Sequence, residues 1–296
     1  MAGLVHLPQE FADAAAAFAD GSKEPVEPRD AATVVLMRRG RGDASGGPEL
    51  YLLRRQVSME FAGGMCVFPG GGVDPRDDDT ALAWAGPSPA EWAERLGVDE
   101  GMARALVCAA VRETFEESGV LLAGEHPDDV VADTTGADWE ADRVALEKRE
   151  LAMSDLLERR GLVLRTDLLG AWAGWLTPVF EPKRYRTWFF VAELPEGQRT
   201  RDVSSESDHV VWLPALEAVE QAESRQILML PPTYITCLDV AQYADPDAVI
   251  AEAAGRRVEM FCPQVEEEGE HFTLTRPPHA DALLEARSRT ATWGSA

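Results

Sequence analysis

Cysteine and long apolar runs are scarce in this sequence. Its four cysteines lie far apart with no paired spacing, which favours neither a zinc knuckle nor a disulfide framework. No stretch approaches the about 18 uninterrupted apolar residues of a membrane helix. Acidic residues lie in and around the Ala-rich N-terminal stretch, where a signal peptide would be basic, and the last residues match no peroxisomal tripeptide. We therefore expect a cytoplasmic protein without a membrane partner.

Positive charge is also scarce, because the formal net charge is −24 over 296 residues. Only three of the 28 basic residues are lysine, which we interpret as compositional bias. So much negative charge would repel nucleic acid, whose binding depends on Lys and Arg. For most of the surface the acidity serves solubility. A small anionic substrate would need metal cations or a local arginine cluster to bind.

The apolar residues form short runs that alternate with amphipathic segments, and 296 residues suffice for one large domain or a domain with additions. Strands are predicted at 31–37, 49–55, 65–68, 169–176, 187–194, 208–213, 257–261 and 271–275. Helices are predicted at 88–96, 99–119, 138–160, 214–223, 233–243 and 246–254, and residues 1–20 as a short helix or loose arm. The stretch 41–48 reads as a hairpin loop. This alternation predicts an α/β fold around a mixed sheet.

The predicted helix that ends at Gly119 carries three carboxylates on one face. Glu113, Glu116 and Glu117 have the spacing i, i+3, i+4, and the opposite face is apolar, formed by Val107, Val111 and Phe115. Three like charges so close repel one another, and a hard divalent cation such as Mg²⁺ removes that cost. Arg112 lies four residues before Glu116 and can pair with it, which orients the carboxylate.

A solvated acidic helix face is the alternative explanation of this pattern, and it would suffice for a bare Glu-x-x-Glu-Glu. The preceding arginine and the following glycine favour chemistry, because the string Arg-Glu-x-x-Glu-Glu arises by chance on the order of 10⁻⁵ per position. The turn Pro69-Gly70-Gly71 upstream adds to this. We therefore interpret the helix as a metal platform.

These residues resemble the Nudix family, whose box ends in Arg-Glu-apolar-x-Glu-Glu-x-Gly-apolar. The second half of the box is present at 112–120, with Thr114 at the apolar position, and the first half at 68–71. The position eight residues before Arg112 should be Glu and is Arg104, and about 30 extra residues separate the glycines from the helix. An insertion at this place is similar to that of the coenzyme A diphosphatase subgroup (Nudix hydrolase nineteen-like). The same subgroup is resembled by the stretches 54–71, 113–122, 176–178, 184–190 and 227–233. Arg186 is an exception, because relatives have Asp at this position.

The resemblance implies an α/β/α sandwich with a mixed central sheet and extra helices. It divides the chain into an N-terminal arm or linker (1–30), a Nudix hydrolase domain (31–225) and a C-terminal extension packed on the same domain (226–296). Within the domain it places the insertion at about 75–103 and a helical segment at about 138–160. Residues after 225 fit either a flap over the substrate or a contact in a homodimer.

The resemblance also implies Mg²⁺- or Mn²⁺-dependent hydrolysis of a nucleoside diphosphate linked to another group, a pyrophosphatase reaction. Glu113, Glu116 and Glu117 would hold the metal, and Glu113 or Glu206 would accept the proton of water. Substrate contacts would come from Arg54, Arg55, Gly70, Gly71 and Arg184. Glu206 and the arginines also fit ordinary surface charges.

Coenzyme A or an acyl-coenzyme A is the first substrate that the resemblance implies. NADH, ADP-ribose or a dinucleotide polyphosphate is the second. A module that binds a nucleotide as a sensor without cutting it is an alternative of another class, and Arg104 in place of Glu keeps it open. The same replacement leaves the number of metal ions open.

Overall fold

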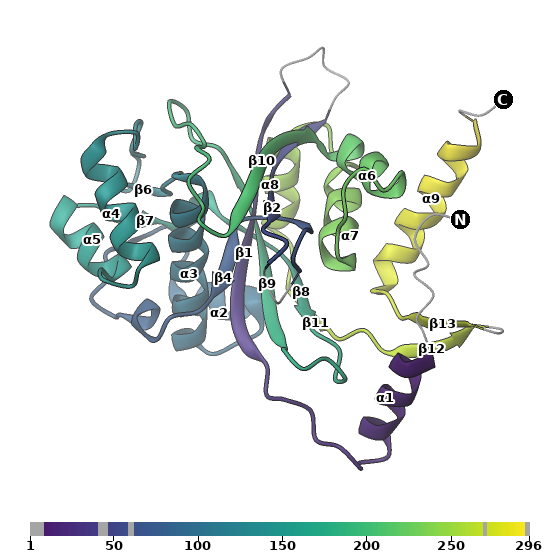
Figure 1. The fold of residues 1–296 in the computed structure, drawn as a ribbon. Coiled ribbons are helices and arrows are strands. Elements are labelled where there is room, and N and C mark those ends of the chain that lie inside the picture. The colour runs from purple at the N-terminus through teal and green to yellow at the C-terminus, as the bar shows by residue number, and fades with distance from the viewer. Residues whose placement is uncertain (1–8, 41–46, 59–61, 269–270, 294–296) are drawn as a thin grey trace.

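A mixed sheet forms the centre of the protein, in a computed structural model that describes residues 9–40, 47–58, 62–268 and 271–293 (Figure 1). The strand order is β10-β2-β1-β9-β8-β11, with β3 added to β2 and β4 added to β1. These strands are β1 (Arg29–Arg39), β2 (Pro48–Arg55), β3 (Cys66–Val67), β4 (Gly70–Gly72), β8 (Gly170–Leu176), β9 (Tyr185–Glu193), β10 (Ser207–Pro214) and β11 (Met260–Phe261).

Strand β1 lies in the middle of this sheet. It pairs with β9 in parallel over nine residues and with β2 and β4 in antiparallel fashion. A parallel pair needs a long crossover connection, which the chain between β1 and β9 supplies. Because β4 is the Gly70–Gly72 turn itself, its pairing with Ala31–Thr33 fixes the glycines to the centre of the sheet.

Both faces of the central strands are buried. Along β1, the side chains of Val34 and Leu36 join one apolar cluster, while those of Val35 and Met37 join the other. A strand that is buried on both sides reads as a continuous apolar run and not as an alternating one, which explains the sequence of residues 31–37. The predicted α/β/α sandwich with a mixed central sheet is confirmed.

Helices cover the two faces, as Figure 1 shows. The first cluster includes side chains from α2 (Pro89–Leu96), α3 (Glu100–Ser118), α4 (Ala137–Glu147) and α5 (Met153–Arg160). The second includes side chains from α6 (Ala215–Glu223), α7 (Pro231–Val240), α8 (Pro246–Ala253) and α9 (Pro278–Trp293). Helix α1 (Gln9–Ala19) contacts β12. No helix within the described residues is both long and apolar enough to cross a bilayer.

Two small sheets accompany the central one. The first is made of β5 (Trp84–Ala85), β7 (Val163–Arg165) and β6 (Ala123–Gly124), and the second is the hairpin of β12 (Val265–Glu268) and β13 (His271–Leu274). Two short 3-10 helices complete the elements, η1 (Pro75–Asp78) and η2 (Thr166–Leu168). Strand β5 lies in the inserted segment, between η1 and α2. Its pairing with β7 joins this segment to the rest of the domain.

Most of the predicted elements are present within a few residues. The expected helix at 138–160 is wrong in one respect, because the chain forms two helices, α4 and α5, separated where Arg149 adopts a left-handed backbone with φ of 59°. Pro214 is the cap residue of α6 and not its first helical residue. Helix α9 and strand β12 were not predicted. Of the expected hairpin loop at 41–48, residues 41–46 lie outside the described residues.

Candidate active site

Helix α3 is held at both ends by its caps. The Asp99 carboxylate accepts a hydrogen bond from the backbone N–H of Met102 at 2.9 Å, and Gly119 ends the helix with φ of 75°. Val107, Val111 and Phe115 are fully buried in the cluster beneath the sheet. The apolar face therefore anchors the helix, and the carboxylate face is turned toward the glycine turn.

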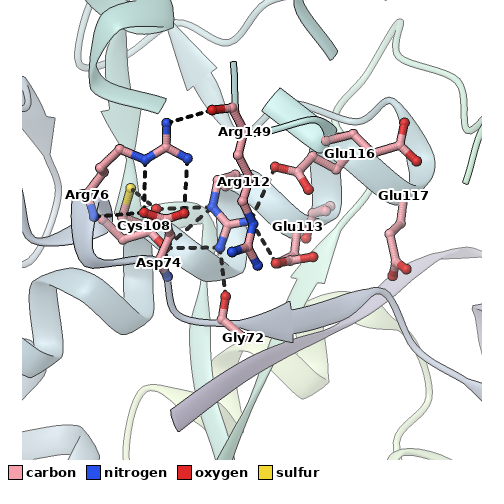
Figure 2. Close-up of polar contacts among 12 residues, drawn as sticks. Gly72, Asp74, Arg76, Cys108, Arg112, Glu113, Glu116, Glu117 and Arg149 are labelled. Carbon is pink, nitrogen blue, oxygen red and sulfur yellow. Dashed lines mark hydrogen bonds and ion pairs between the residues drawn. The ribbon is translucent and has the colours of Figure 1, made fainter. Parts of the chain in front are cut away.

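Two of the glutamates of α3 accept hydrogen bonds from Arg112, as Figure 2 shows, and the third contacts the glycine turn. Glu113 and Glu116 accept hydrogen bonds from Nη1 of Arg112 at 2.7 and 3.2 Å. The Glu117 carboxylate accepts the backbone N–H of Gly70 at 2.8 Å. Helix and turn are thus in direct contact, as the sequence pattern required.

The glycines at this contact have no room for a side chain. A Cβ atom at Gly71 would lie 2.6 Å from the Glu113 carboxylate, and one at Gly70 would lie 2.5 Å from the carbonyl oxygen of Ala32. Glycine is therefore required sterically at Gly70, where a Cβ atom would meet backbone, while a Cβ atom at Gly71 would require the Glu113 side chain to move. Both residues line the cavity described below.

Arg112 is the centre of a buried network. Its guanidinium donates from Nε to Oδ1 of Asp77 at 3.0 Å and from Nη2 to Oδ2 at 2.9 Å, a paired geometry that fixes its plane. Nη2 also donates to the carbonyl of Gly72 at 2.9 Å. The Asp77 side chain is only 2% exposed. Arg112 thus connects the acidic helix, the glycine turn and the inserted segment, a wider role than orienting Glu116.

Asp77 corrects the interpretation of the missing acid. The box that the sequence resembles places its first acid after a glycine and five further residues, and counting in this way from Gly71 reaches Asp77. The insertion therefore follows this acid and precedes α3. Arg104 instead pairs with Asp78 at 3.8 Å and lies over the ring of Trp84. Counting backward from Arg112 crossed the insertion and reached the wrong position. Sequence reasoning missed Asp77, although its spacing from Gly71 was visible.

The buried carboxylates of α3 resist ionisation in the metal-free protein. Burial raises the pKa of Glu116 to about 7, with a contribution from the charge of Glu113, although Arg112 opposes the shift. Burial also raises the pKa of Glu113, and it raises that of Glu117 well above its ordinary value. Each shift reports a carboxylate that lacks sufficient positive charge nearby. The cluster is therefore built to receive cations.

Glu206 and Arg55 face this cluster from across the cavity. Their side chains form an ion pair at 2.8 Å, and both line the cavity. The charge of Glu206 contributes to the raised pKa of Glu113 and of Glu117, so it lies within electrostatic reach of both. The Nε of Arg55 is buried and has no hydrogen-bond partner among the described residues.

The other two arginines singled out in the sequence are placed elsewhere. Arg54 is half exposed and pairs with Asp208 at 2.6 Å. Arg184 is buried and donates to the backbone carbonyls of Thr177 and Val26 at 3.1 and 2.9 Å. Neither of them lines the cavity that holds the glutamates. Both arginines therefore make structural contacts: Arg54 binds to β10, and Arg184 binds to the N-terminal segment.

A cavity of about 780 Å³ joins these residues. One end is lined by the carboxylates of α3, the glycine turn, Arg55 and Glu206. The rest of the lining includes apolar side chains from α1 (Phe11), β8 (Trp175 and Leu176), the loop after β8 (Phe180), the segment after β11 (Pro263) and β13 (Leu274). The volume lies within the range of about 300–1,000 Å³ that is usual for ligand sites.

The donor set fits a hard divalent cation in its chemistry. Three carboxylates from one helical turn, all short of positive charge, offer the oxygen ligands that such ions prefer. One oxygen of each carboxylate accepts a hydrogen bond from Arg112 or Gly70, and no group of three potential ligand side chains among the described residues is already gathered around one point. Each carboxylate has a second oxygen that these bonds do not use, so cation binding would require the side chains to converge.

Comparisons with known proteins agree with this geometry. A family model described as the NUDT19 Nudix domain matches residues 88–238, just over half of the chain. The chain is similar to acyl-coenzyme A diphosphatase NUDT19 from Gallus gallus, with 27% identity over 256 residues that cover 70% of this chain and 66% of that protein. It is also similar to the protein of the same name from Xenopus laevis, with 24% identity over 230 residues that cover 66% of this chain and 60% of that protein. The chain thus spans less than two thirds of the length of these relatives.

A solved structure is similar as well. The Nudix hydrolase from Alicyclobacillus acidocaldarius superimposes with a TM-score of 0.65 and 26% sequence identity, covering 76% of this chain and 96% of that one. The similarity in structure covers more of the chain than the family model does.

Removing the buried partner of Arg112 tests the network. We expect Asp77→Ala to lower the free energy of unfolding by about 3 kcal/mol, because it leaves a buried guanidinium without its paired acceptor. Asp78→Ala is the matched control, since Asp78 is half exposed and meets Arg104 only at 3.8 Å, and it should cost less than about 1 kcal/mol. Urea denaturation measures both, and equal losses would contradict the network.

The raised pKa of Glu116 predicts how stability depends on pH. The folded state holds this proton more tightly than the unfolded chain, whose ordinary value is 4.5. In EDTA the free energy of unfolding should therefore fall by up to about 3 kcal/mol as the pH rises from about 4.5 to about 7.

Urea denaturation across this pH range tests the expectation. Magnesium should restore more stability at about pH 8 than at about pH 5, because it binds the ionised carboxylates. Glu116→Gln should flatten the fall in EDTA. A stability that rises through this window in the unsubstituted protein, or a magnesium effect independent of pH, would contradict the account.

Proposed function

The chain belongs to the family of the NUDT19 Nudix domain, and we propose that it is a metal-dependent hydrolase that cuts the diphosphate linkage of coenzyme A or of an acyl-coenzyme A. The observation that carries this proposal is the contact between the three glutamates of α3 and the Gly70–Gly72 turn at one end of a large cavity. The names of the two curated relatives support the substrate.

Glu113, Glu116 and Glu117 would hold Mg²⁺ or Mn²⁺. When bound, such an ion activates water and neutralises charge on the phosphates. Arg112 stays on Asp77 and positions the helix against the turn. Arg55 lines the cavity, and its guanidinium would donate to a phosphate oxygen. Glu113 and Glu206 are the two candidates to accept the proton of the attacking water.

The sensor alternative loses its support at this site. It rested on the absence of an acidic residue at position 104, and Asp77 supplies a carboxylate to Arg112 in its place. Glu113, Glu116 and Glu117 line one cavity, and Asp77 holds the guanidinium of Arg112 beside them. This favours cleavage over binding alone.

The apolar lining of the cavity favours a substrate with an apolar group. The rings of Phe11 and Phe180 meet edge to face with 5.7 Å between their centroids. The hydroxyl of Thr177 in the same wall is already used by the backbone of Tyr185, at 3.1 Å from its N–H. Apart from the carboxylate of Glu181, these residues offer mainly ring and methyl surface, which suits an acyl chain better than a polar group.

A panel of diphosphates tests the reaction. With magnesium, the purified protein should release 4′-phosphopantetheine from coenzyme A, or its acyl form from an acyl-coenzyme A, detected by chromatography. NADH, ADP-ribose and dinucleotide polyphosphates complete the panel and are expected to be cut more slowly. Turnover of those compounds but not of coenzyme A derivatives would contradict the coenzyme A proposal and would favour NADH, ADP-ribose or a dinucleotide polyphosphate as substrate. No turnover on the whole panel would contradict hydrolysis.

Glu116→Gln and Glu117→Gln should each lower kcat at least about tenfold with the fold intact, because each removes an anionic ligand. The amides retain the size of the side chains, and circular dichroism serves as the check on folding. Asp208→Asn is a control, since this carboxylate is outside the cavity and pairs with Arg54. Near-normal kcat in both glutamine variants would refute the metal role.

Phe180→Ala should lower kcat/KM for a long-chain acyl-coenzyme A about tenfold, because it removes ring surface from the apolar wall. Free coenzyme A is the control, as it has no acyl chain to place there, and its kcat/KM should change less than about twofold. Equal losses on both substrates would show that the wall binds the part they share, such as the adenine base.

A further inference from the structure

The charges around the cavity are unbalanced. Carboxylates outnumber arginines among the lining residues, which include Asp74, Glu113, Glu116, Glu117, Glu147, Glu181 and Glu206 against Arg55, Arg76, Arg112 and Arg149. Such a lining repels the phosphates of a nucleotide, even if metal ions neutralise part of it. Any arginine that is not already paired is therefore important for binding.

Three of these four arginines have a carboxylate partner. Arg55 pairs with Glu206 at 2.8 Å, and Arg76 pairs with Asp74 at 2.9 Å. Arg112 is shared between Asp77 and the glutamates of α3. The guanidinium of Arg149 has no ion pair or hydrogen bond with any residue that the structure describes, and the residue is exposed at the edge of the cavity.

The backbone at Arg149 is strained and held in place. Its φ of 59° is in the left-handed region, which a residue with a side chain adopts at a cost of about 1–2 kcal/mol. The N–H of Arg149 donates to the carbonyl of Leu146 at 2.7 Å, and its own carbonyl accepts from Nη1 of Arg76 at 3.2 Å (Figure 2). Glycine would relieve the strain, yet the chain has arginine here.

A second contact strengthens this placement. The Arg76 guanidinium that holds the Arg149 carbonyl also binds both oxygens of Asp74, at 2.9 and 3.0 Å. Asp74 in turn caps the short helix that contains Asp77. The position of Arg149 is thereby linked to the same inserted segment that orients Arg112.

We propose that Arg149 is a substrate-binding residue whose guanidinium binds a phosphate group of the nucleotide substrate. The inference rests on the proposed function, since it concerns the same cavity. Guanidinium is the side chain that best matches phosphate oxygens, through paired hydrogen bonds. The residue joins α4 to α5, so it also gives the helical segment at 138–160 a role in the site: it carries a cation to the edge of an acidic cavity.

Variants at Arg149 separate its charge from its backbone. Arg149→Ala and Arg149→Gly both remove the guanidinium, and glycine also relieves the left-handed strain. Arg149→Lys retains a positive charge without the planar fork. Arg225→Ala is the matched control, because Arg225 is another exposed arginine with a left-handed φ of 60° and does not line the cavity.

The probe is α,β-methylene-ADP with magnesium, a diphosphate that is not cut, and its Kd is measured by calorimetry on the full chain. We expect Arg149→Ala and Arg149→Gly each to raise the Kd about tenfold, as the loss of a charged hydrogen bond does. Arg149→Lys should raise it less, about threefold, and Arg225→Ala should leave it unchanged. In the substrate assay the alanine variant should raise KM more than it lowers kcat.

The outcomes are distinct from those of the proposed function. Binding of the analogue that depends on Arg149, together with no turnover on any diphosphate, would support this inference and overturn hydrolysis. An unchanged Kd in Arg149→Ala, equal losses in Arg149→Ala and Arg225→Ala, or no binding of the analogue to the unsubstituted protein would each overturn the role of Arg149. A loss in alanine that glycine restores would assign the residue to backbone structure alone.

Discussion

The candidate site depends on one buried arginine that carboxylates from two parts of the chain share. Arg112 holds Asp77 through two parallel hydrogen bonds and at the same time meets Glu113 and Glu116 on its own helix. A buried cation of this kind is stable only while its partners remain. The single positive charge cannot satisfy all of these acids, so the carboxylates of α3 keep raised pKa values. This deficit of positive charge favours the binding of a metal cation by the carboxylates.

The fold positions this network with strands and not with loops. The glycine turn is itself a strand, β4, paired with the start of β1, and α3 packs on the same sheet through its fully buried apolar face. At the contact between Gly70 and Glu117, the Glu117 side chain is buried and Gly70 is half-buried at the cavity. The apolar lining of the cavity comes from other elements, namely α1, β8 and the loop after it, the segment after β11, and β13.

The sequence predicted the parts of the site that a local pattern encodes. Glu113, Glu116 and Glu117 share a helix face because of their spacing, and Gly119 ends that helix because it adopts a left-handed backbone. Asp77 was missed because the position of the acid was counted backward from Arg112 across the insertion and not forward from Gly71. Arg149 depends on a contact across the insertion that local spacing does not reveal. Arg184 shows the converse: a cationic residue near an expected site turned out to serve backbone carbonyls. Helix α9 was missed because its apolar positions are few and follow a proline-containing stretch.

A crystal structure of the protein with manganese tests the central claim most directly, because the anomalous signal of the metal locates it without reference to activity. The account predicts a peak among the carboxylates of Glu113, Glu116 and Glu117, with Arg112 still paired to Asp77. Manganese bound elsewhere, or no peak at this cluster while the three carboxylates retain their contacts with Arg112 and Gly70, would contradict it.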